Sequence, residues 1–246
     1  MSDAFLSQTI TLATEDGEIE AYAALVQDSA PRGGVVVIHH MPGYDAESKE
    51  IVRHFAALGY NAVMPNLYHR DAPGAAPDDA AAAGRAKGGV PDDRLVTDVT
   101  GAAAYLRALP NSNGKVGTIG YCSGGRQSVL AAISVDVDAA VDCYGAFVTG
   151  TVPEGFPLRV KPLGERVAGV RCPILGLFGK DDQYPSPEQV AELEQLLKDS
   201  GKEYEFHSYE GAGHAFFAVD RPAFRPEAAK DGWTKITAFY GKHLGA

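Results

Sequence analysis

Six consecutive residues in the middle of the chain have the types and spacing that covalent catalysis needs. Residues 120–125 read Gly-Tyr-Cys-Ser-Gly-Gly, between an apolar run at 116–119 and a segment with helical spacing. A nucleophile elbow has this pattern, because the strand-to-helix turn is so sharp that its flanking positions must be glycine, while the central side chain is pushed out above the sheet. The central residue here is Cys122. A free cysteine is often only a small buried apolar residue, but packing alone does not require glycines at this spacing.

The predicted place of Cys122 at the start of a helix suits a thiol nucleophile. Partial positive charge collects at a helix N-terminus and favours the thiolate, which is the reactive form of cysteine. The backbone N–H of Ser123 would point to where the oxyanion of a tetrahedral intermediate forms. We therefore predict that Cys122 attacks a carbonyl carbon and that Ser123 supplies one donor of the oxyanion hole.

A thiol nucleophile needs a general base and a group that orients the base, and two later loops can supply them. Residues 179–185 bring two carboxylates after the apolar run at 174–178, and a glycine-rich loop ends in His214. An acidic loop residue or a lone histidine is often only structural. Nucleophile, acid and histidine nevertheless follow one another in the order found in α/β-hydrolases. We expect Asp182, rather than Asp181, to orient His214.

The elements that must position these residues follow from the hydrophobic pattern. Apolar runs alternate with helical patterns, which indicates one α/β domain with a mostly parallel, doubly wound sheet and helices on both faces. Residues 71–91 are rich in Ala, Gly and Asp, and they predict a flexible lid or loop, or a disordered linker. Strands are predicted over residues 9–12, 18–26, 34–39, 60–64, 115–120, 139–144, 174–178 and 204–209, and helices over 46–58, 92–109, 124–134, 186–200 and 226–243, with 149–170 irregular.

The composition excludes several other classes of function. The 246 residues carry 32 acidic and 22 basic side chains, a formal net charge of −10, which argues against a nucleic-acid partner. No apolar run reaches the roughly 18 to 20 residues of a membrane helix, and residues 1–10 lack the basic start and apolar centre of a signal peptide. We expect a cytoplasmic protein that does not associate with membranes.

The cysteines and histidines do not have metal-ligand spacing. Three cysteines are too few and oddly numbered for a disulfide framework, and none lies in a Cys-x-x-Cys pair. The adjacent His39 and His40 lack the i, i+4 spacing of helical zinc ligands. We expect neither a metal nor another cofactor, and we interpret Cys143 and Cys172 as structural residues.

Five segments of the chain together resemble those of one known family: residues 61–68, 112–117, 120–125, 179–182 and 211–214. With these segments the chain resembles the dienelactone hydrolases, or carboxymethylenebutenolidases, over nearly its whole length, and the elbow is the most specific part. The resemblance implies the α/β-hydrolase fold and a Cys122-His214-Asp182 triad that hydrolyses small carboxylic esters or lactones through an acyl-thiol intermediate. It also implies that the backbone N–H of Met41 is the second oxyanion donor.

The chain departs from the best-known members of that family at two places. His40 stands where those members have a glutamate that pairs with the resting thiol. His40 could hold Cys122 as a thiolate–imidazolium pair, or it could be a satisfied histidine near the core. After His214 the chain reads Ala-Phe-Phe-Ala over 215–218, without the serine and arginine that grip a substrate carboxylate. We therefore expect neutral short-chain or aryl esters to be better substrates than an anionic lactone.

Several aromatic side chains could line the substrate pocket or belong to the core, namely Tyr44, Tyr121, Phe147, Tyr184 and Phe216. The leading hypothesis is a hydrolase of small esters or lactones that acts alone or as a homodimer. Two alternatives stay open: a broad-specificity esterase or activated-phosphoester hydrolase on the same triad, and a non-catalytic binding or redox-sensing protein with a reactive thiol. An oriented general base favours catalysis, because sensing needs none.

Overall fold

The computed structural model describes residues 4–41 and 43–245, and in these ranges the strands form one eight-stranded sheet in the order β1-β2-β4-β3-β5-β6-β7-β8. β1 (Phe5–Thr14) and β2 (Gly17–Val26) form an antiparallel hairpin, and β2 also pairs antiparallel with β4. All later neighbours pair in parallel. These parallel strands are β3 (Arg32–Ile38), β4 (Asn61–Pro65), β5 (Ser112–Tyr121), β6 (Ala139–Cys143), β7 (Ile174–Gly179) and β8 (Tyr204–Tyr209).

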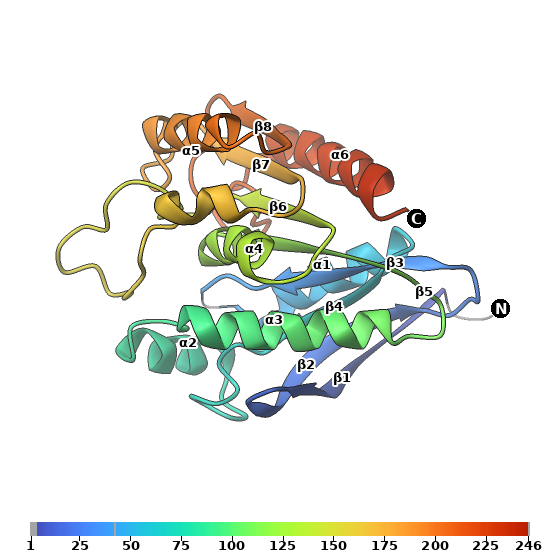
Figure 1. The fold of residues 1–246 in the computed structure, drawn as a ribbon. Coiled ribbons are helices and arrows are strands. Elements are labelled where there is room, and N and C mark those ends of the chain that lie inside the picture. Colours follow the sequence, from blue (N-terminus) through green and yellow to red (C-terminus); the bar gives the residue numbers. More distant parts are fainter. Residues whose placement is uncertain (1–3, 42, 246) are drawn as a thin grey trace.

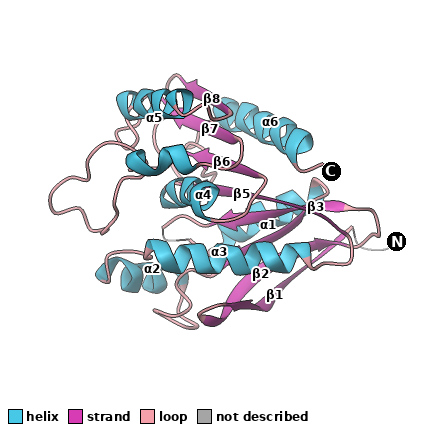
Figure 2. Cartoon of the chain, viewed as in Figure 1, coloured by secondary structure: helices cyan, strands magenta, loops and turns pink. Residues whose placement is uncertain are grey.

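Helices cover both faces of the sheet, as Figures 1 and 2 show. α1 (Ala46–Ala57) and α6 (Pro226–His243) pack on one face, where Phe55 and Ile236 enter a buried cluster. The other face is covered by α3 (Asp92–Arg107), α4 (Ser123–Ser134) and α5 (Pro187–Asp199), with their own buried cluster. A strand between two such layers must be apolar on both sides, and residues 35–38 of β3 are fully buried.

Local signals set the ends of the helices. Asp45 caps α1 by accepting the Ser48 N–H at 2.8 Å, and Ser186 and Gln189 form a capping box at the start of α5. Each cap satisfies N–H groups that have no partner within the helix. The doubly wound α/β architecture expected from the sequence is confirmed, and most predicted elements begin and end within three residues of the observed ones.

The segment 71–91 differs from its prediction as a loop. It contains α2 (Pro77–Ala86), with proline in its first turn and acidic residues beside it, both of which favour a helix start. Gly84 lies on the ring of Tyr68, where a Cβ would come within 2.7 Å of the ring, so this helix packs on the domain. A short 3₁₀ helix, η1 (Gly164–Gly169), likewise interrupts the segment that was expected to be irregular.

Parallel strands bring the chain segments that follow them to one edge of the sheet. Figure 1 shows α2 and the long loop after β6 at this edge, and the two chain termini at the opposite end. Residues from different loops therefore meet where β3, β5, β7 and β8 end. Among the helices of the described residues, none is long and apolar enough to cross a membrane.

Candidate active site

Cys122 occupies a strained turn between β5 and α4. Its backbone has φ 56° and ψ −122°, a conformation that L residues other than glycine rarely adopt. The turn requires glycine on both sides of Cys122, because the backbone approaches itself closely there. A Cβ on Gly120 would lie 1.8 Å from the Gly124 carbonyl oxygen, and one on Gly124 would lie 2.3 Å from the Ile38 carbonyl oxygen. The Cys122 N–H donates to the Cys143 carbonyl at 3.0 Å. Cys122 is therefore fixed by its backbone and stays partly exposed.

His214 and Asp182 come together from the loops after β8 and β7. The Nδ1 of His214 lies 2.8 Å from the Oδ2 of Asp182, and the other carboxylate oxygen accepts the Tyr184 N–H at 2.9 Å. Asp182 is only 7% exposed, whereas the neighbouring Asp181 is exposed and donates its backbone N–H to Ala212. The structure thus places Asp182, and not Asp181, against the imidazole.

The other side of His214 interacts with Cys122. Burial by itself lowers the pKa of His214, but hydrogen bonds to Asp182 and Cys122, together with the charges of both groups, outweigh it and raise that pKa to about 10. An imidazole with this pKa is protonated at neutral pH. The imidazole of His214 therefore lies between the Asp182 carboxylate and the Cys122 sulfur, an order of groups that could support a cysteine nucleophile.

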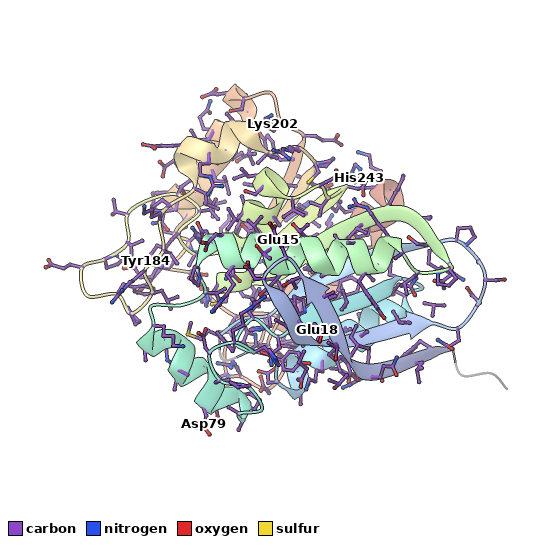
Figure 3. The ribbon with its side chains drawn as sticks, turned by 60° about the horizontal axis from the view of Figure 1, so that its bottom comes forward. Glu15, Glu18, Asp79, Tyr184, Lys202 and His243 are labelled. Carbon is purple, nitrogen blue, oxygen red and sulfur yellow. The ribbon has the colours of Figure 1, made fainter. Side chains whose placement is uncertain are left out.

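Cys122 and His214 open onto a cavity of about 440 Å³. Its walls come from the residues between α2 and α3, from the long loop after β6 and from the loop after β7. The Arg159 N–H donates to the Gly88 carbonyl at 2.7 Å and joins the first two walls. Tyr184, labelled in Figure 3, lies beside the long loop, with its ring 5.3 Å from that of Phe147. The larger apolar lining residues are Met41, Leu67, Tyr68, Val90, Phe147, Phe156, Leu158, Val160 and Tyr184.

The two residues expected to supply oxyanion donors both line this cavity. Ser123 is the first residue of α4, so its N–H has no acceptor within the helix. Met41 follows the end of β3, the strand next to β5. Both backbones therefore lie at the sheet edge that carries Cys122, and their N–H groups are candidates for binding a developing negative charge.

Four of the expected thiol-activating and pocket residues lie elsewhere. The ring of His40 faces Asp45, with 3.1 Å between Nε2 and Oδ2, and His40 is not part of the cavity wall that contains Cys122. Tyr44, Tyr121 and Phe216 are at most 8% exposed and belong to the cluster beneath α1 and α6. Their assignment to this pocket is corrected. Tyr121 is the last residue of β5 and its side chain is buried in that cluster, whereas Cys122, the residue after it, packs at the margin of the cluster and lines the cavity.

His39 is a wall residue that the sequence interpretation missed. It is buried, and burial above all lowers its pKa to about 4, so the ring is neutral. Its Nδ1 donates to the His40 carbonyl at 2.9 Å, and its Nε2 accepts the Leu67 N–H at 3.2 Å. His39 thus joins the chain after β3 to the chain after β4. The apolar run that ends in two histidines was the only sequence signal for this role.

Cys143 and Cys172 are buried and lie in the two core clusters. Burial raises the pKa of the Cys143 thiol well above its usual value and that of Cys172 to about 12. Both thiols are therefore inert at neutral pH. In the part of the chain that the structure describes, one group of three potential metal ligands comes together, namely His40, Asp45 and Glu47, with ligand atoms within 4.8 Å of one another.

Comparisons with known proteins point to one family of enzymes. The model of the dienelactone hydrolase family matches residues 19–244. A carboxymethylenebutenolidase of Pseudomonas putida is 32% identical and aligns over 91% of this chain and 92% of its own. A provisionally named carboxymethylenebutenolidase of Methylorubrum extorquens is 28% identical over 98% of this chain and 83% of its own. The crystal structure of a provisionally named dienelactone hydrolase from Klebsiella pneumoniae has a TM-score of 0.86 at 25% identity, covering 98% of this chain and 100% of that one.

Proposed function

Because the chain belongs to the dienelactone hydrolase family, we propose that it hydrolyses small carboxylic esters or lactones through an acyl-thiol intermediate on Cys122. The observation that carries this proposal is the position of His214, whose Nδ1 meets the buried Asp182 at 2.8 Å while the ring also interacts with Cys122. His214 is then the acid–base group, and Asp182 fixes its orientation and tautomer.

In the first half of the reaction, the Cys122 thiolate attacks the carbonyl carbon of the ester. A C–S bond forms, and the electron pair of the C=O bond moves to oxygen, where we assign the N–H groups of Ser123 and Met41 to stabilise it. When the tetrahedral intermediate collapses, the C–O bond breaks. His214 donates its Nε2 proton to the departing alkoxide, which leaves a thioester and a neutral imidazole.

In the second half, water takes the place of the alcohol. His214 accepts a proton from the water molecule, and the resulting hydroxide attacks the thioester carbonyl. Collapse breaks the C–S bond, releases the carboxylic acid and restores the thiolate beside the imidazolium. The raised pKa of His214 suits both halves of the reaction. The resting imidazolium donates the proton in the first half, and the neutral imidazole that remains is a stronger base toward water in the second.

The cavity lining favours a neutral acyl or aryl group as substrate. Most of the wall is apolar, and its arginine, Arg126, is already paired with Asp92 through two hydrogen bonds of 2.8 and 3.0 Å. A substrate carboxylate would therefore lose its hydration without gaining an uncompensated cation in this wall. We propose that neutral aryl or short-chain esters are hydrolysed more efficiently than a lactone that carries a carboxylate.

Active-site titration with a neutral aryl ester tests the mechanism. The wild type should release a burst of one phenolate per chain before steady turnover, because acylation of Cys122 expels the alcohol first. Cys122→Ala should give no burst, whereas Cys172→Ala, a matched change at a buried thiol, should keep it. A burst in Cys122→Ala would exclude this thiol as the nucleophile. A reactive thiol that alkylates but never turns over an ester would instead favour the redox-sensing alternative.

A further inference from the structure

A second cavity of about 220 Å³ lies behind the elbow, on the face of the sheet covered by α1 and α6. Glu47 and Ile51 stand one turn apart on α1, Tyr121 ends β5, and Trp233 comes from α6. Phe217 closes the wall from the chain that follows β8. Four separate elements therefore build this cavity, which is distinct from the one that contains Cys122.

Most of the wall would suit the body of a small organic molecule. The Trp233 ring stands edge-on to Phe217, with 6.0 Å between ring centroids and 89° between planes. Ile51 adds an aliphatic side chain, and the exposed Val219 lies at the rim. Apolar and aromatic walls with few polar groups are typical of small-molecule sites.

Two buried polar atoms of this wall have no partner among the described residues. Tyr121 is 3% exposed and its hydroxyl makes no hydrogen bond. Glu47 accepts the Val219 N–H at 3.1 Å with Oε1, but its Oε2 is buried and unpaired. A buried polar atom without a hydrogen bond destabilises the folded protein. A ligand that forms hydrogen bonds with both atoms would therefore remove both unfavourable contributions.

The acidic side chains of this wall are Glu47 and Glu50, and His40 lies beside Glu47 outside the wall. Asp220 lies close enough to Glu47 that, after burial, its carboxyl is the next cause of a raised Glu47 pKa. None of the described residues in the wall is a lysine or arginine, and burial lowers the pKa of His54, which disfavours its charged form. The second acidic wall residue, Glu50, is already paired with Arg53. Glu47 and Asp220 thus bring two like carboxylates together, and a cationic ligand would relieve the repulsion between them.

We propose that this cavity binds a small organic ammonium ion, with its N–H groups on Glu47 and the Tyr121 hydroxyl and its apolar body against the Trp233–Phe217 pair. A carboxylate supplies the charge, and aromatic faces attract a cation as well as an apolar body. A metal ion at His40, Asp45 and Glu47 is the competing occupant, but a metal ion would leave the aromatic part of the wall unused. This inference does not depend on the proposed hydrolase activity.

Trp233 makes the proposal directly measurable, because it is the one tryptophan among the 246 residues. Cyclohexylammonium chloride should change the tryptophan fluorescence saturably at neutral pH in the metal-free protein. Cyclohexanol has the same shape without the charge, and it should bind at least tenfold more weakly. Saturation by neither probe, or equal binding of both, would overturn the proposal.

Variants assign the interaction to its residues. Glu47→Gln should weaken cyclohexylammonium binding at least tenfold, and Tyr121→Phe, which removes only the hydroxyl, should weaken it several-fold. Glu50→Gln is the matched control at a paired carboxylate of the same wall and should change binding less than threefold. Unchanged binding in folded Glu47→Gln and Tyr121→Phe proteins would refute the site. Saturation by Zn²⁺ with no response to cyclohexylammonium would show a metal site and refute it as well.

Discussion

The two carboxylate oxygens of Asp182 have different partners: Oδ2 lies 2.8 Å from the Nδ1 of His214, and Oδ1 accepts the Tyr184 N–H at 2.9 Å. Neither the carboxylate nor the imidazole ring can therefore rotate freely. We expect Asp182→Asn to lower kcat/KM for an aryl ester by about 10²- to 10⁴-fold, because an amide can present its N–H to Nδ1 and favour the wrong tautomer. Asp181→Asn is the matched control at an exposed neighbour and should stay within about threefold of wild type. The reverse ranking would exchange the two roles.

The protonation of His214 should depend on Cys122. In wild type, NMR should show the His214 ring titrating near pH 10, because Asp182 and Cys122 outweigh the effect of burial. Cys122→Ala removes one of the groups that raise the His214 pKa, so that pKa should fall. The His214 pKa is higher in the folded protein than in the unfolded chain, so protonated His214 contributes to the free energy of unfolding. This contribution is complete below the unfolded pKa near 6.5 and is lost as the pH rises through about 10. A wild-type midpoint near 6.5 would contradict the ion pair.

The three thiols should react with iodoacetamide in a fixed order. Cys122 lines a cavity and is partly exposed, whereas Cys143 is fully buried and Cys172 nearly so. We expect peptide mapping after brief labelling at pH 7 to find Cys122 modified first, with loss of esterase activity in proportion. Labelling of either buried thiol ahead of Cys122 in folded protein would be inconsistent with this structure.

His40→Ala should leave the alkylation of Cys122 nearly unchanged, within about twofold, because the His40 ring bonds to Asp45 and does not line the cavity of the thiol. The second-order rate constant with iodoacetamide measures this directly. His214→Ala is the informative comparison, since it removes the imidazole that interacts with Cys122, and it should slow alkylation strongly. A slowing by His40→Ala as large as that by His214→Ala would restore His40 as a thiol-activating group.

Substrate preference should follow the apolar wall. Neutral phenyl acetate should have a kcat/KM at least about tenfold above that of a dienelactone carboxylate. The carboxylate would lose its hydration, and the arginine of the described wall, Arg126, is already paired with Asp92. Initial rates with the two substrates at one pH measure the ratio. Phe156→Ala should reduce the preference, since Phe156 packs on Phe147 in that wall. A preference for the anionic lactone would instead show that the pocket recognises the carboxylate.

The placement of Cys122, Asp182 and His214 at strand ends could be predicted because each depends on local sequence. Apolar runs mark the buried strands, and glycines around Cys122 are needed where a Cβ would strike the backbone. The side chains around the thiol were harder to assign. Whether His39 or His40 faces the cavity is set by how the chain turns after β3, and no local pattern specifies that turn.

Tertiary packing also explains why the wall residues were only partly identified. Phe147 and Tyr184 line the cavity, while Tyr121 and Phe216 join the opposite core, although all four lie close to strand ends. Phe156, Leu158 and Val160 come from a loop without periodicity, where composition carries no information about direction. Helix α2 was missed because glycines and prolines, which are typical of loops, flank it within residues 71–91, although its alanine run and its first-turn proline favour a helix.

The two halves of the active site are attached to the fold in different ways. The proposed reacting groups are fixed at strand ends by a strained turn and by buried hydrogen bonds, whereas the apolar wall of the cavity is carried by two peripheral segments that join at the hydrogen bond between Arg159 and Gly88. Evolution could therefore replace the wall without disturbing the reacting groups. A designer who exchanges residues 146–163 and 87–91 between relatives should transfer substrate range while retaining the same reaction.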